Sequence, residues 1–337
     1  MKAFVRFGLT ASLCCGVPAA TSGVSAQNAP EPVCQRACLE NWVNQYLEAM
    51  RAHNVDPKLF ARDVKFTENG IRLPLGGEGL WYDMSGIGTY KFYVPDVETQ
   101  QVAFIGTVRE AARTSAAGAP ATPGVVALAL RLRIRNNRIT EVEQLAIRPD
   151  RPLGGRPSSS PFPETGAAVE KMGSPNPMFL QAIPEKERAS REELVRTANY
   201  YFAGLQRNDG KGYYPFTEDC DRYENGVAVL ANVLDPDTGK RGRMGCKRQF
   251  EVGVRGIVSR IRDRRFVAVD RERGIVFAFA FFDHHNINWT WQLAELFKIE
   301  NGRIRRIEAV FHRAPFGINS GWSTYEQGMS EEIQSIR

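Results

Sequence analysis

The 337-residue chain lacks the short motifs that would name a chemistry. It contains no glycine-rich phosphate loop, no Gly-x-Ser-x-Gly nucleophile elbow and no His-Glu-x-x-His zinc motif. Nucleotide, flavin and zinc dependence therefore have no support, and we expect no cofactor and no metal site. Histidine is also scarce, with four in the chain, so few side chains can shuttle protons near neutral pH.

Long apolar runs are missing as well, apart from one near the N-terminus. A basic start precedes an apolar stretch at residues 7–20, and Val24-Ser25-Ala26 offers the small residues that a signal peptidase reads. No later segment approaches the ~20 apolar residues that span a bilayer. We therefore expect a signal peptide at 1–26 and a periplasmic or secreted protein with no membrane segment after cleavage.

What the chain does have is an internal repeat. Thr-Glu-Asn-Gly at 67–70 returns as Tyr-Glu-Asn-Gly at 223–226, and the segment 133–139 is echoed at 298–304. Equivalent segments in the same order at nearly constant spacing indicate a duplicated domain.

Two domains of ordinary size fit the chain that follows the expected leader. Proline, serine and glycine with little periodicity fill the stretch between the copies, which is typical of a linker and could pack against one domain. Residues 113–123, rich in Ala, Gly and Pro, indicate a mobile loop. The expected order is a signal peptide at 1–26, a first domain at 34–148, a linker at 149–189, a second domain at 190–325 and a C-terminal tail at 326–337.

Each copy is predicted to begin with a helix and to continue as antiparallel strands, which indicates an α+β fold. Apolar residues spaced by three and four predict helices at 35–53 and 190–207, the second with Ser190 and Glu193 as a capping box. Shorter helices are expected at 57–62 and 212–218. Strands with Asn-Asn or Asn-Gly hairpin turns are predicted at 125–134, 139–147, 274–282, 289–299 and 304–312.

Four cysteines lie beyond the expected leader. An even number in an exported chain suggests two disulfides, for which three pairings exist. We favour Cys34–Cys38 and Cys220–Cys246, because each of these bonds stays within one copy. A metal or redox role for Cys-x-x-x-Cys is less favoured, since no second ligand pair has zinc-like spacing.

The formal net charge is +6, and many basic residues cluster late in the chain. We favour a solvated face over attraction to an acidic substrate or polymer. Nucleic acid is not an expected partner, because aromatic residues are not interleaved there and the chain is expected to be exported. The cluster consists of Arg255, Arg260, Arg262, Arg264, Arg265, Arg271 and Arg273.

Several local strings together resemble the SnoaL-like branch of the nuclear transport factor two-like (NTF2-like) superfamily, and in particular a secreted group found in fungi and bacteria. The resemblance covers about residues 34–148 and 190–325. It rests on the helix–helix–strand order and on Trp42 with Tyr46, Thr67-Glu68-Asn69-Gly70, Gly79-Leu80-Trp81 and Phe281-Phe282-Asp283-His284.

The resemblance implies a cone-shaped α+β barrel in each copy, in which a curved antiparallel sheet wraps around N-terminal helices. It also implies a deep apolar pocket and acid–base chemistry without a cofactor. Domains of this superfamily commonly pair sheet to sheet, so the two copies could form an internal pseudo-dimer, and further oligomerisation is left open. The superfamily hosts many activities and many binders, so the fold does not choose among them.

The adjacent histidines His284 and His285 are the first catalytic candidates, because the first copy has Thr107-Val108-Arg109-Glu110 in roughly that position. Neighbouring side chains of a strand point to opposite faces. If Phe282 and His284 enter a pocket, Asp283 and His285 point away from it. A neutral histidine can shuttle protons. The alternative is a histidine at a strand end that only bonds a loop carbonyl.

The acidic candidates are Asp219 and Asp221, which would orient or protonate the histidine, and Arg222 would steady an oxyanion. Asp221 and Arg222 have no like-for-like match in the first copy. They are therefore better candidates than Glu224, whose Glu-Asn-Gly motif occurs in both copies and favours a turn.

Aromatic and basic side chains could bind a substrate. Tyr201 and Tyr214 could donate phenolic hydrogen bonds, although Tyr201 also suits the core of its helix. Trp289 and Trp291 share a strand face and would line an aromatic pocket or pack a domain interface. The segment that begins with His312 and Arg313 could fold over the pocket mouth, with surface packing as the alternative.

The favoured function is an exported, cofactor-independent acid–base enzyme of lyase, dehydratase or isomerase type. Its substrate would be a small, partly aromatic or polycyclic molecule in the pocket of the second domain. A non-catalytic module that binds a hydrophobic ligand or a protein is one alternative, and an epoxide or lactone hydrolase is another. A histidine inside a pocket beside a carboxylate would favour the enzyme. If the first copy is a scaffold, its pocket should be smaller or filled.

Overall fold

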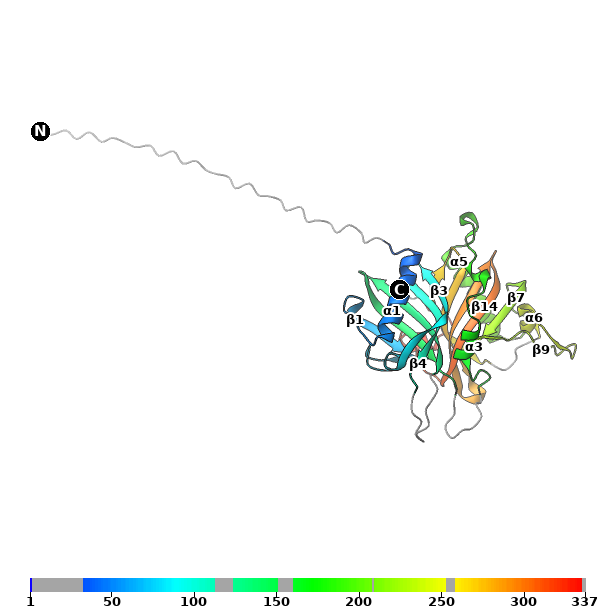
Figure 1. Ribbon diagram of the computed structural model, residues 1–337. Coiled ribbons are helices and arrows are strands. Elements are labelled where there is room, and N and C mark those ends of the chain that lie inside the picture. The colour runs from blue at the N-terminus through cyan, green and yellow to red at the C-terminus, as the bar shows by residue number, and fades with distance from the viewer. Residues whose placement is uncertain (2–32, 113–123, 151–159, 208, 253–257, 335–337) are drawn as a thin grey trace. The chain divides into compact units, whose positions relative to one another are not determined.

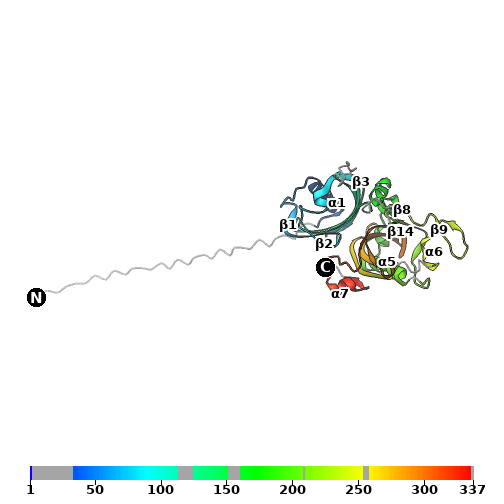
Figure 2. The same ribbon diagram turned by 90° about the horizontal axis from the view of Figure 1, so that it is seen from below.

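The computed structural model describes residues 1, 33–112, 124–150, 160–207, 209–252 and 258–334. The expected signal peptide beyond Met1, the expected loop at 113–123 and Arg255 lie outside these ranges. Val33–Arg337 forms one compact unit, separate from Met1–Pro32. This unit has an α+β fold with two curved sheets and few helices (Figures 1 and 2).

The first half forms a six-stranded sheet in the order β2-β1-β6-β5-β4-β3. Only the β1–β6 pair is parallel, and helix α1 packs on β3 and β4. The elements are α1 (Arg36–Arg51), β1 (Phe60–Glu68), β2 (Ile71–Arg72), α2 (Leu80–Asp83), β3 (Met84–Asp96), β4 (Gln101–Glu110), β5 (Val125–Arg135) and β6 (Arg138–Ile147).

The second half forms a seven-stranded sheet in the order β15-β11-β12-β13-β14-β7-β8, with α5 packed on it and a separate β9–β10 hairpin. Its elements are α5 (Arg191–Arg207), β7 (Phe216–Glu224), β8 (Val227–Ala228), β9 (Val233–Leu234), β10 (Arg241–Gly242), α6 (Cys246–Glu251), β11 (Arg260–Asp270), β12 (Ile275–His284), η3 (His285–Ile287), β13 (Trp289–Glu300), β14 (Arg303–Pro315), α7 (Tyr325–Met329) and β15 (Ile333–Gln334).

The two sheets share one strand register. In the first, Glu68 of β1 pairs with Gln144 of β6, which pairs with Leu130 of β5. In the second, Glu224 of β7 pairs with Ala309 of β14, which in turn pairs with Glu295 of β13. Residues of the two halves can therefore be compared position by position.

The Asn-Gly part of each repeated motif builds a turn. Asn69 and Asn225 have φ values of 50° and 51°, and the glycines that follow also have positive φ. Each asparagine side chain makes two hydrogen bonds to the backbone of one residue on the neighbouring strand, Ala146 or Phe311. The motif therefore joins the β1–β2 and β7–β8 turns to the strand beside them, which agrees with a structural role.

The longer predicted elements are confirmed, and the two short helices are wrong. Helices α1 and α5 form as expected, and Ser190 and Glu193 exchange the two hydrogen bonds of a capping box. Residues 57–62 and 212–218 instead lead into β1 and β7. Those strands run parallel to β6 and β14, so distant partners supply the backbone hydrogen bonds that a local helix would have made.

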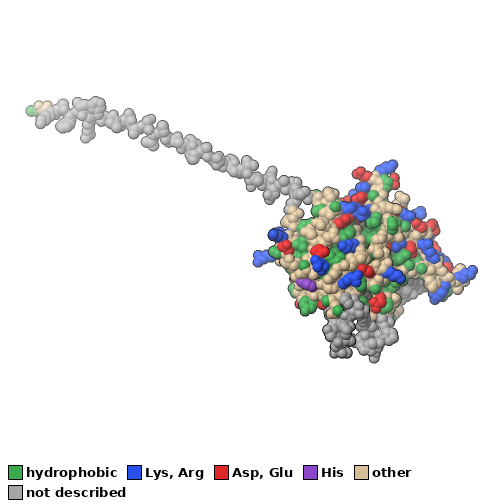
Figure 3. Space-filling view, in the orientation of Figure 1, with side chains coloured by type: hydrophobic (Ala, Val, Ile, Leu, Met, Phe, Trp, Pro, Cys, Tyr) green, Lys and Arg blue, Asp and Glu red, His purple; other side chains and the backbone are tan. Residues whose placement is uncertain are grey.

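The middle of the basic cluster is buried rather than solvated, whereas the Arg271 side chain is 42% exposed. Arg262, Arg264 and Arg265 lie on β11 with exposed fractions of 0%, 5% and 2%. Arg265 donates two hydrogen bonds to Glu143, at 2.8 and 2.6 Å, and Arg262 donates to Asp283 at 2.9 Å. Arg262 and Arg265 pair with carboxylates from other strands, and Arg264 bonds Gln206 of α5; local sequence reveals none of these distant partners. On the face drawn in Figure 3, basic and acidic side chains are interspersed.

The two sheets share a hydrophobic core that includes Phe92 and Ile105 from the first half and Phe277 and Leu296 from the second. Besides the Arg265–Glu143 pair, the Tyr90 hydroxyl donates to Glu308 at 3.0 Å. Each half thus presents a buried glutamate to a donor of the other half.

The segment between the halves packs against both of them, beyond the one-sided packing considered from sequence. Phe179 of α4 stacks edge to face on Phe92, and Phe162 does so on Phe311. Its described helices are α3 (Thr165–Lys171), α4 (Pro177–Leu180) and η2 (Glu185–Glu187). Within the described residues, no helix combines the length and apolarity needed to cross a bilayer.

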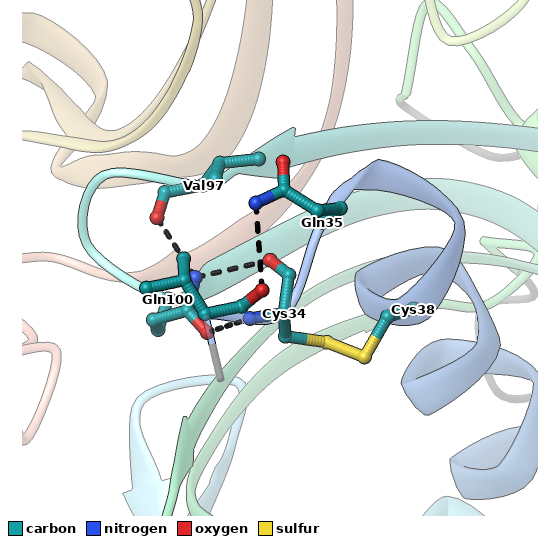
Figure 4. The surroundings of a disulfide bond; sticks show 6 residues. Cys34, Gln35, Cys38, Val97 and Gln100 are labelled. Carbon is teal, nitrogen blue, oxygen red and sulfur yellow. Dashed lines mark hydrogen bonds between the residues drawn. A yellow bond between two sulfur atoms is a disulfide. The ribbon is translucent and has the colours of Figure 1, made fainter. Parts of the chain in front are cut away.

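Both favoured disulfides are present. Cys34–Cys38 closes the start of α1, where the Gln100 side chain donates to the Cys34 carbonyl at 3.1 Å and accepts from its amide at 2.8 Å (Figure 4). Cys220–Cys246 ties β7 to α6. These bonds fix the ends of elements that pack on each sheet.

Candidate functional site

A cavity of about 300 Å³ lies in the second half. This volume is at the small end for ligand sites. Strands β7, β12, β13 and β14 and helix α5 supply most of its wall, and the segment between the halves closes one side. The lining residues are Pro161, Phe162, Tyr201, Leu205, Arg222, Glu224, Val258, Phe282, His284, Trp291, Leu293, Glu295, Ala309 and Phe311.

Strand alternation explains which side chains enter the cavity. On β13, Trp291, Leu293 and Glu295 share the inward face, and on β12 Phe282 and His284 do so. The face of β12 is therefore as expected. The rings of Trp291 and Phe311 pack edge to face with their centroids 4.6 Å apart, which gives the cavity an aromatic wall.

Three polar side chains cluster at one end of the cavity. Arg222 Nη2 lies 3.0 Å from Glu224 Oε1, and its Nη1 donates to the Tyr201 hydroxyl at 3.4 Å. Glu295 faces them from β13 and is 2% exposed. The Arg222–Glu224 pair is internally compensated, so its net charge is zero.

Glu295 is a neutral acid near pH 7. Burial raises its pKa to about 8, against the opposing attraction of Arg222. Burial also raises the pKa of Tyr201 well above its usual value. A hydrogen bond from Tyr201 to Glu295 raises the pKa of the tyrosine further and opposes the rise at the carboxyl, so the Glu295 carboxyl is the group with a proton to offer the cavity.

His284 is a neutral base on β12, at the other end of the cavity from Glu295. Its Nδ1 lies 3.0 Å from the Phe282 carbonyl oxygen. A carbonyl can only accept, so in the neutral ring the proton sits on Nδ1 and Nε2 is the acceptor. Burial lowers the pKa of His284, which keeps the ring neutral.

Buried polar atoms without a partner gather at this cavity. Among the described residues, Arg222 Nε, His284 Nε2 and Glu295 Oε2 are buried and make no hydrogen bond. Such atoms are uncommon in folded proteins because each costs roughly 1–3 kcal/mol. Three of the eight such atoms among the described residues belong to the lining of this one cavity, which indicates a site arranged for a ligand.

Three carboxylates expected from sequence lie outside the cavity lining. Asp283 points to the other face of β12 and accepts hydrogen bonds from Arg260, Arg262 and Thr290. Burial alone would raise its pKa, but these bonds lower it overall. Asp219 is exposed and bonds Arg305 at 3.1 Å. Asp221 lies 3.9 Å from Arg306. On β7, Arg222 enters the cavity, so Asp221 before it faces outward.

Of the other residues expected from sequence, some line the cavity or adjoin its wall and others do not. Tyr201 and Trp291 line the cavity, and Trp289 sits behind Trp291 with ring centroids 5.9 Å apart. Arg313 stacks on Trp289 at 4.1 Å. The remaining three are placed elsewhere: Tyr214 accepts from the Gly212 amide, the His285 ring packs on Phe316, and His312 contacts Gln292.

Sequence reasoning missed Glu295 and the contribution of Pro161 and Phe162, and ranked Glu224 too low. The signal for Glu295 was available: it follows Trp289, Trp291 and Leu293 at every second position, so the alternation places its carboxyl on the same inward face. No comparable signal marks Phe162, because its place on the wall follows from tertiary packing alone.

The comparisons with known proteins concern the same region. A family model described as a domain of unknown function, DUF8021, matches residues 187–311, which include every lining residue except Pro161 and Phe162. No curated protein gives a match.

Two solved structures are weakly similar. One is a de novo designed protein with a curved β-sheet, at 16% identity and a TM-score of 0.26, covering 37% of this chain and 88% of that one. The other is an NTF2-like protein of unknown function from Burkholderia xenovorans, at 16% identity and a TM-score of 0.25, covering 40% of this chain and 98% of that one.

Proposed function

We propose that this protein is an exported, cofactor-independent acid–base enzyme of lyase, dehydratase or isomerase type. Its substrate is a small, partly aromatic molecule held in the cavity of the second half. One observation carries the proposal: a protonated buried carboxyl, Glu295, and a neutral imidazole acceptor, His284, line the same aromatic cavity. The two groups lie at opposite ends of the cavity, since His284 pairs with Trp289 and Glu295 stands six residues further along β13. One cavity thus offers a base at one end and an acid at the other, the two roles that proton transfer to and from carbon uses.

The chemistry follows from these roles. His284 Nε2 takes a proton from the carbon beside a carbonyl, the electron pair of that C–H bond forms the C=C bond of an enol, and the oxygen takes a proton from water. Glu295 lies six residues along the neighbouring strand from the partner of His284, so with Arg222 it donates to a second oxygen at the other end of the substrate. An isomerase then returns the proton from His284 to another carbon as the enol loses its O–H proton; a dehydratase instead re-forms the carbonyl and expels a β-hydroxyl, which leaves as water with the proton that His284 took up.

The assignment differs from the one made from sequence in its acid. Glu295 replaces Asp219 and Asp221, because those carboxylates lie outside the cavity lining. His284 keeps its role, and His285 is not needed.

Deuterium exchange tests the activity without knowledge of the natural substrate. Acetophenone, propiophenone and 2-hydroxyacetophenone are incubated with the protein in D₂O, and loss of the α-proton signal is followed by NMR. Wild type should speed the exchange, and His284→Ala should lower the rate by roughly 100-fold or more, as expected for loss of a general base. Glu295→Gln should also slow the exchange.

Two variants serve as controls. Glu218→Gln changes an exposed carboxylate on β7 and should leave the rate unchanged. Asp221→Asn decides between the two acids, since a large loss there would favour the assignment from sequence. Binding of these ketones without any exchange would contradict the enzyme and favour a ligand-binding module.

We also propose that each half is a cone-shaped α+β barrel of the NTF2-like kind and that the halves form an internal pseudo-dimer. The shared strand register, the common core between the sheets and the two crossed glutamate contacts support this. With the sheet faces already covered, the protein should be a monomer by light scattering. A stable dimer that buries one of these sheets would argue against the proposal.

Export is part of the same proposal and is supported by the two disulfides. Protein recovered from the periplasm or medium of an expressing bacterium should begin at Gln27. Recovery with Met1 intact would contradict the signal peptide.

A further inference from the structure

We propose that the cavity takes an uncharged aryl ketone or aldehyde of one or two rings and rejects the matching carboxylate. This inference rests on the proposed function for its site but specifies the ligand's charge and polar groups. It rests on the buried polar atoms of the cavity that have no hydrogen-bond partner.

The polar atoms without partners define the ligand's hydrogen-bonding groups. At one end Arg222 Nε–H donates, and Glu295 Oε2 belongs to a carboxyl that can also donate. These two call for an acceptor oxygen. His284 Nε2 also lacks a partner, but it lies at the other end of the cavity, because His284 pairs with Trp289, six residues along β13 from Glu295. The end with Arg222 and Glu295 therefore sets the requirement for a small ligand, and an uncharged carbonyl oxygen meets it.

The charge balance excludes an anion. Arg222 is the cation of the lining, and it is already paired with Glu224 at 3.0 Å. A carboxylate would therefore add an uncompensated negative charge beside Glu224 in an apolar cavity, where burial of an unpaired charge is costly. An uncharged carbonyl oxygen accepts the same hydrogen bonds without that cost.

The aromatic wall and the volume of the cavity limit the shape and size of the ligand's carbon skeleton. Phe162, Phe311 and Trp291 form a continuous series of edge-to-face rings, with centroid separations of 5.5 and 4.6 Å. Such walls favour a flat aromatic ring. A cavity of about 300 Å³ is at the small end for ligand sites, which suits one or two rings rather than a sterol-sized molecule.

Two matched ligand pairs test the inference: acetophenone with benzoate, and 2-acetylnaphthalene with 2-naphthoate. Within each pair a methyl ketone is replaced by a carboxylate of nearly the same shape. Binding is measured by calorimetry and by quenching of tryptophan fluorescence at pH 7. At least one ketone should bind tenfold or more tightly than its carboxylate.

Glu295→Gln is the decisive variant, because the amide keeps a donor but cannot ionise. Between pH 7 and pH 9 the affinity of wild type for the ketone should fall by about tenfold, as the Glu295 carboxyl loses its proton. The affinity of Glu295→Gln should stay constant, and Glu218→Gln should follow wild type. A different ligand class is required if the carboxylates bind as well as the ketones, if neither kind binds, or if Glu295→Gln shows the same pH dependence as wild type.

The outcomes separate this inference from the proposed function. Selective ketone binding without deuterium exchange would support the ligand class and contradict the enzyme. Exchange or turnover on a carboxylate ligand would support an enzyme and overturn the ligand class.

Discussion

In the first half buried side chains fill the space between helix α1 and the sheet, whereas the second half keeps a cavity beside α5. The first half has a hollow of about 830 Å³ elsewhere, around β1, β2 and residues 55–57 and 73–75. At equivalent register positions, the first half has Phe66, Leu130 and Gln144, and the second has Arg222, Glu295 and Ala309. The change from Gln144 to Ala309 removes an amide from the centre of the site. The other two changes place charged or polar groups around the space that this leaves.

The tyrosine and the glutamate that occur at matching positions in both halves have different hydrogen-bond partners. In the first half, Gln144 accepts from the Tyr46 hydroxyl at 2.7 Å and donates to Glu68 at 2.9 Å. Trp81 also donates to that hydroxyl, and Arg148 neutralises Glu68. The tyrosine and glutamate of the first half thus have all their partners. Tyr201 and Glu224, at the matching positions, both contact Arg222 and line the cavity. The same strand register therefore surrounds packed side chains in the first half and a candidate site in the second.

The largest effect is expected from placing the second half's acid into the first half. Leu130→Glu buries a carboxyl where Phe66 stands in place of Arg222, so no cation compensates it. The free energy of unfolding at pH 7 should fall by about 5 kcal/mol, measured by urea denaturation. Leu130→Met, a change of similar volume, should cost less than ~1.5 kcal/mol. Near-wild-type stability of Leu130→Glu would mean that the first half is not as closely filled as described.

A second effect concerns the ionisation of Glu295 itself. Its folded-state pKa, about 8, lies above the unfolded value of 4.5. The stability from this group is therefore complete below about pH 4.5 and is lost progressively as the pH rises to about 8. Relative to Glu295→Gln, wild type should lose up to about 4 kcal/mol across that range, measured as paired denaturation curves. Parallel curves for the two proteins would show that Glu295 ionises normally.

The two disulfides, one in each half, close loops of different length. Cys220–Cys246 spans 26 residues and Cys34–Cys38 spans 4. Because chain-entropy stabilisation grows with loop length, the paired Cys→Ser changes should cost about 3.5 kcal/mol in the second half and about 2 kcal/mol in the first. Equal losses of thermal stability would indicate that native-state packing, rather than loop length, sets the contribution.

Local sequence predicted the parts of the fold that local interactions determine. The β5–β6 and β13–β14 hairpins follow from Asn136-Asn137 and Asn301-Gly302, whose positive φ values the turns require. By contrast, β11 was missed because its arginines look solvated until Glu143 and Asp283 are brought against them from other strands. Burial by a distant partner leaves no periodic trace in the strand itself.

The candidate site, like the fold, could be predicted only where local rules determine it. His284 and Phe282 were placed correctly on one face of their strand because alternation is a local rule. Asp219 and Asp221 lie outside the lining. Asp221 was favoured because the first copy has no like-for-like residue there, which does not tell which face of the strand its side chain takes. The cavity instead takes its acid from β13, across β14 from β7. Only the sheet order brings Glu295 to that end of the cavity.

The smallest change in stability should come from the substitution that tests the comparison most directly. Ala309→Gln introduces into the second half the amide that fills the first, where it can reach Tyr201 and Glu224 as Gln144 reaches Tyr46 and Glu68. The new hydrogen bonds offset the crowding, so the free energy of unfolding should change by roughly 1 kcal/mol or less.

Ligand binding, however, should be lost, because the amide side chain occupies the centre of the cavity. Affinity for acetophenone should drop at least tenfold in Ala309→Gln, and α-proton exchange should disappear. The matched variant in the first half, Gln144→Ala, removes the partner of Tyr46 and leaves a hole, which should cost about 2 kcal/mol while leaving both readouts of the second half intact. If Ala309→Gln still binds the ketone, the absence of an amide at this position is not what opens the cavity, and other differences between the halves, such as the buried Trp81 of the first half, must account for it.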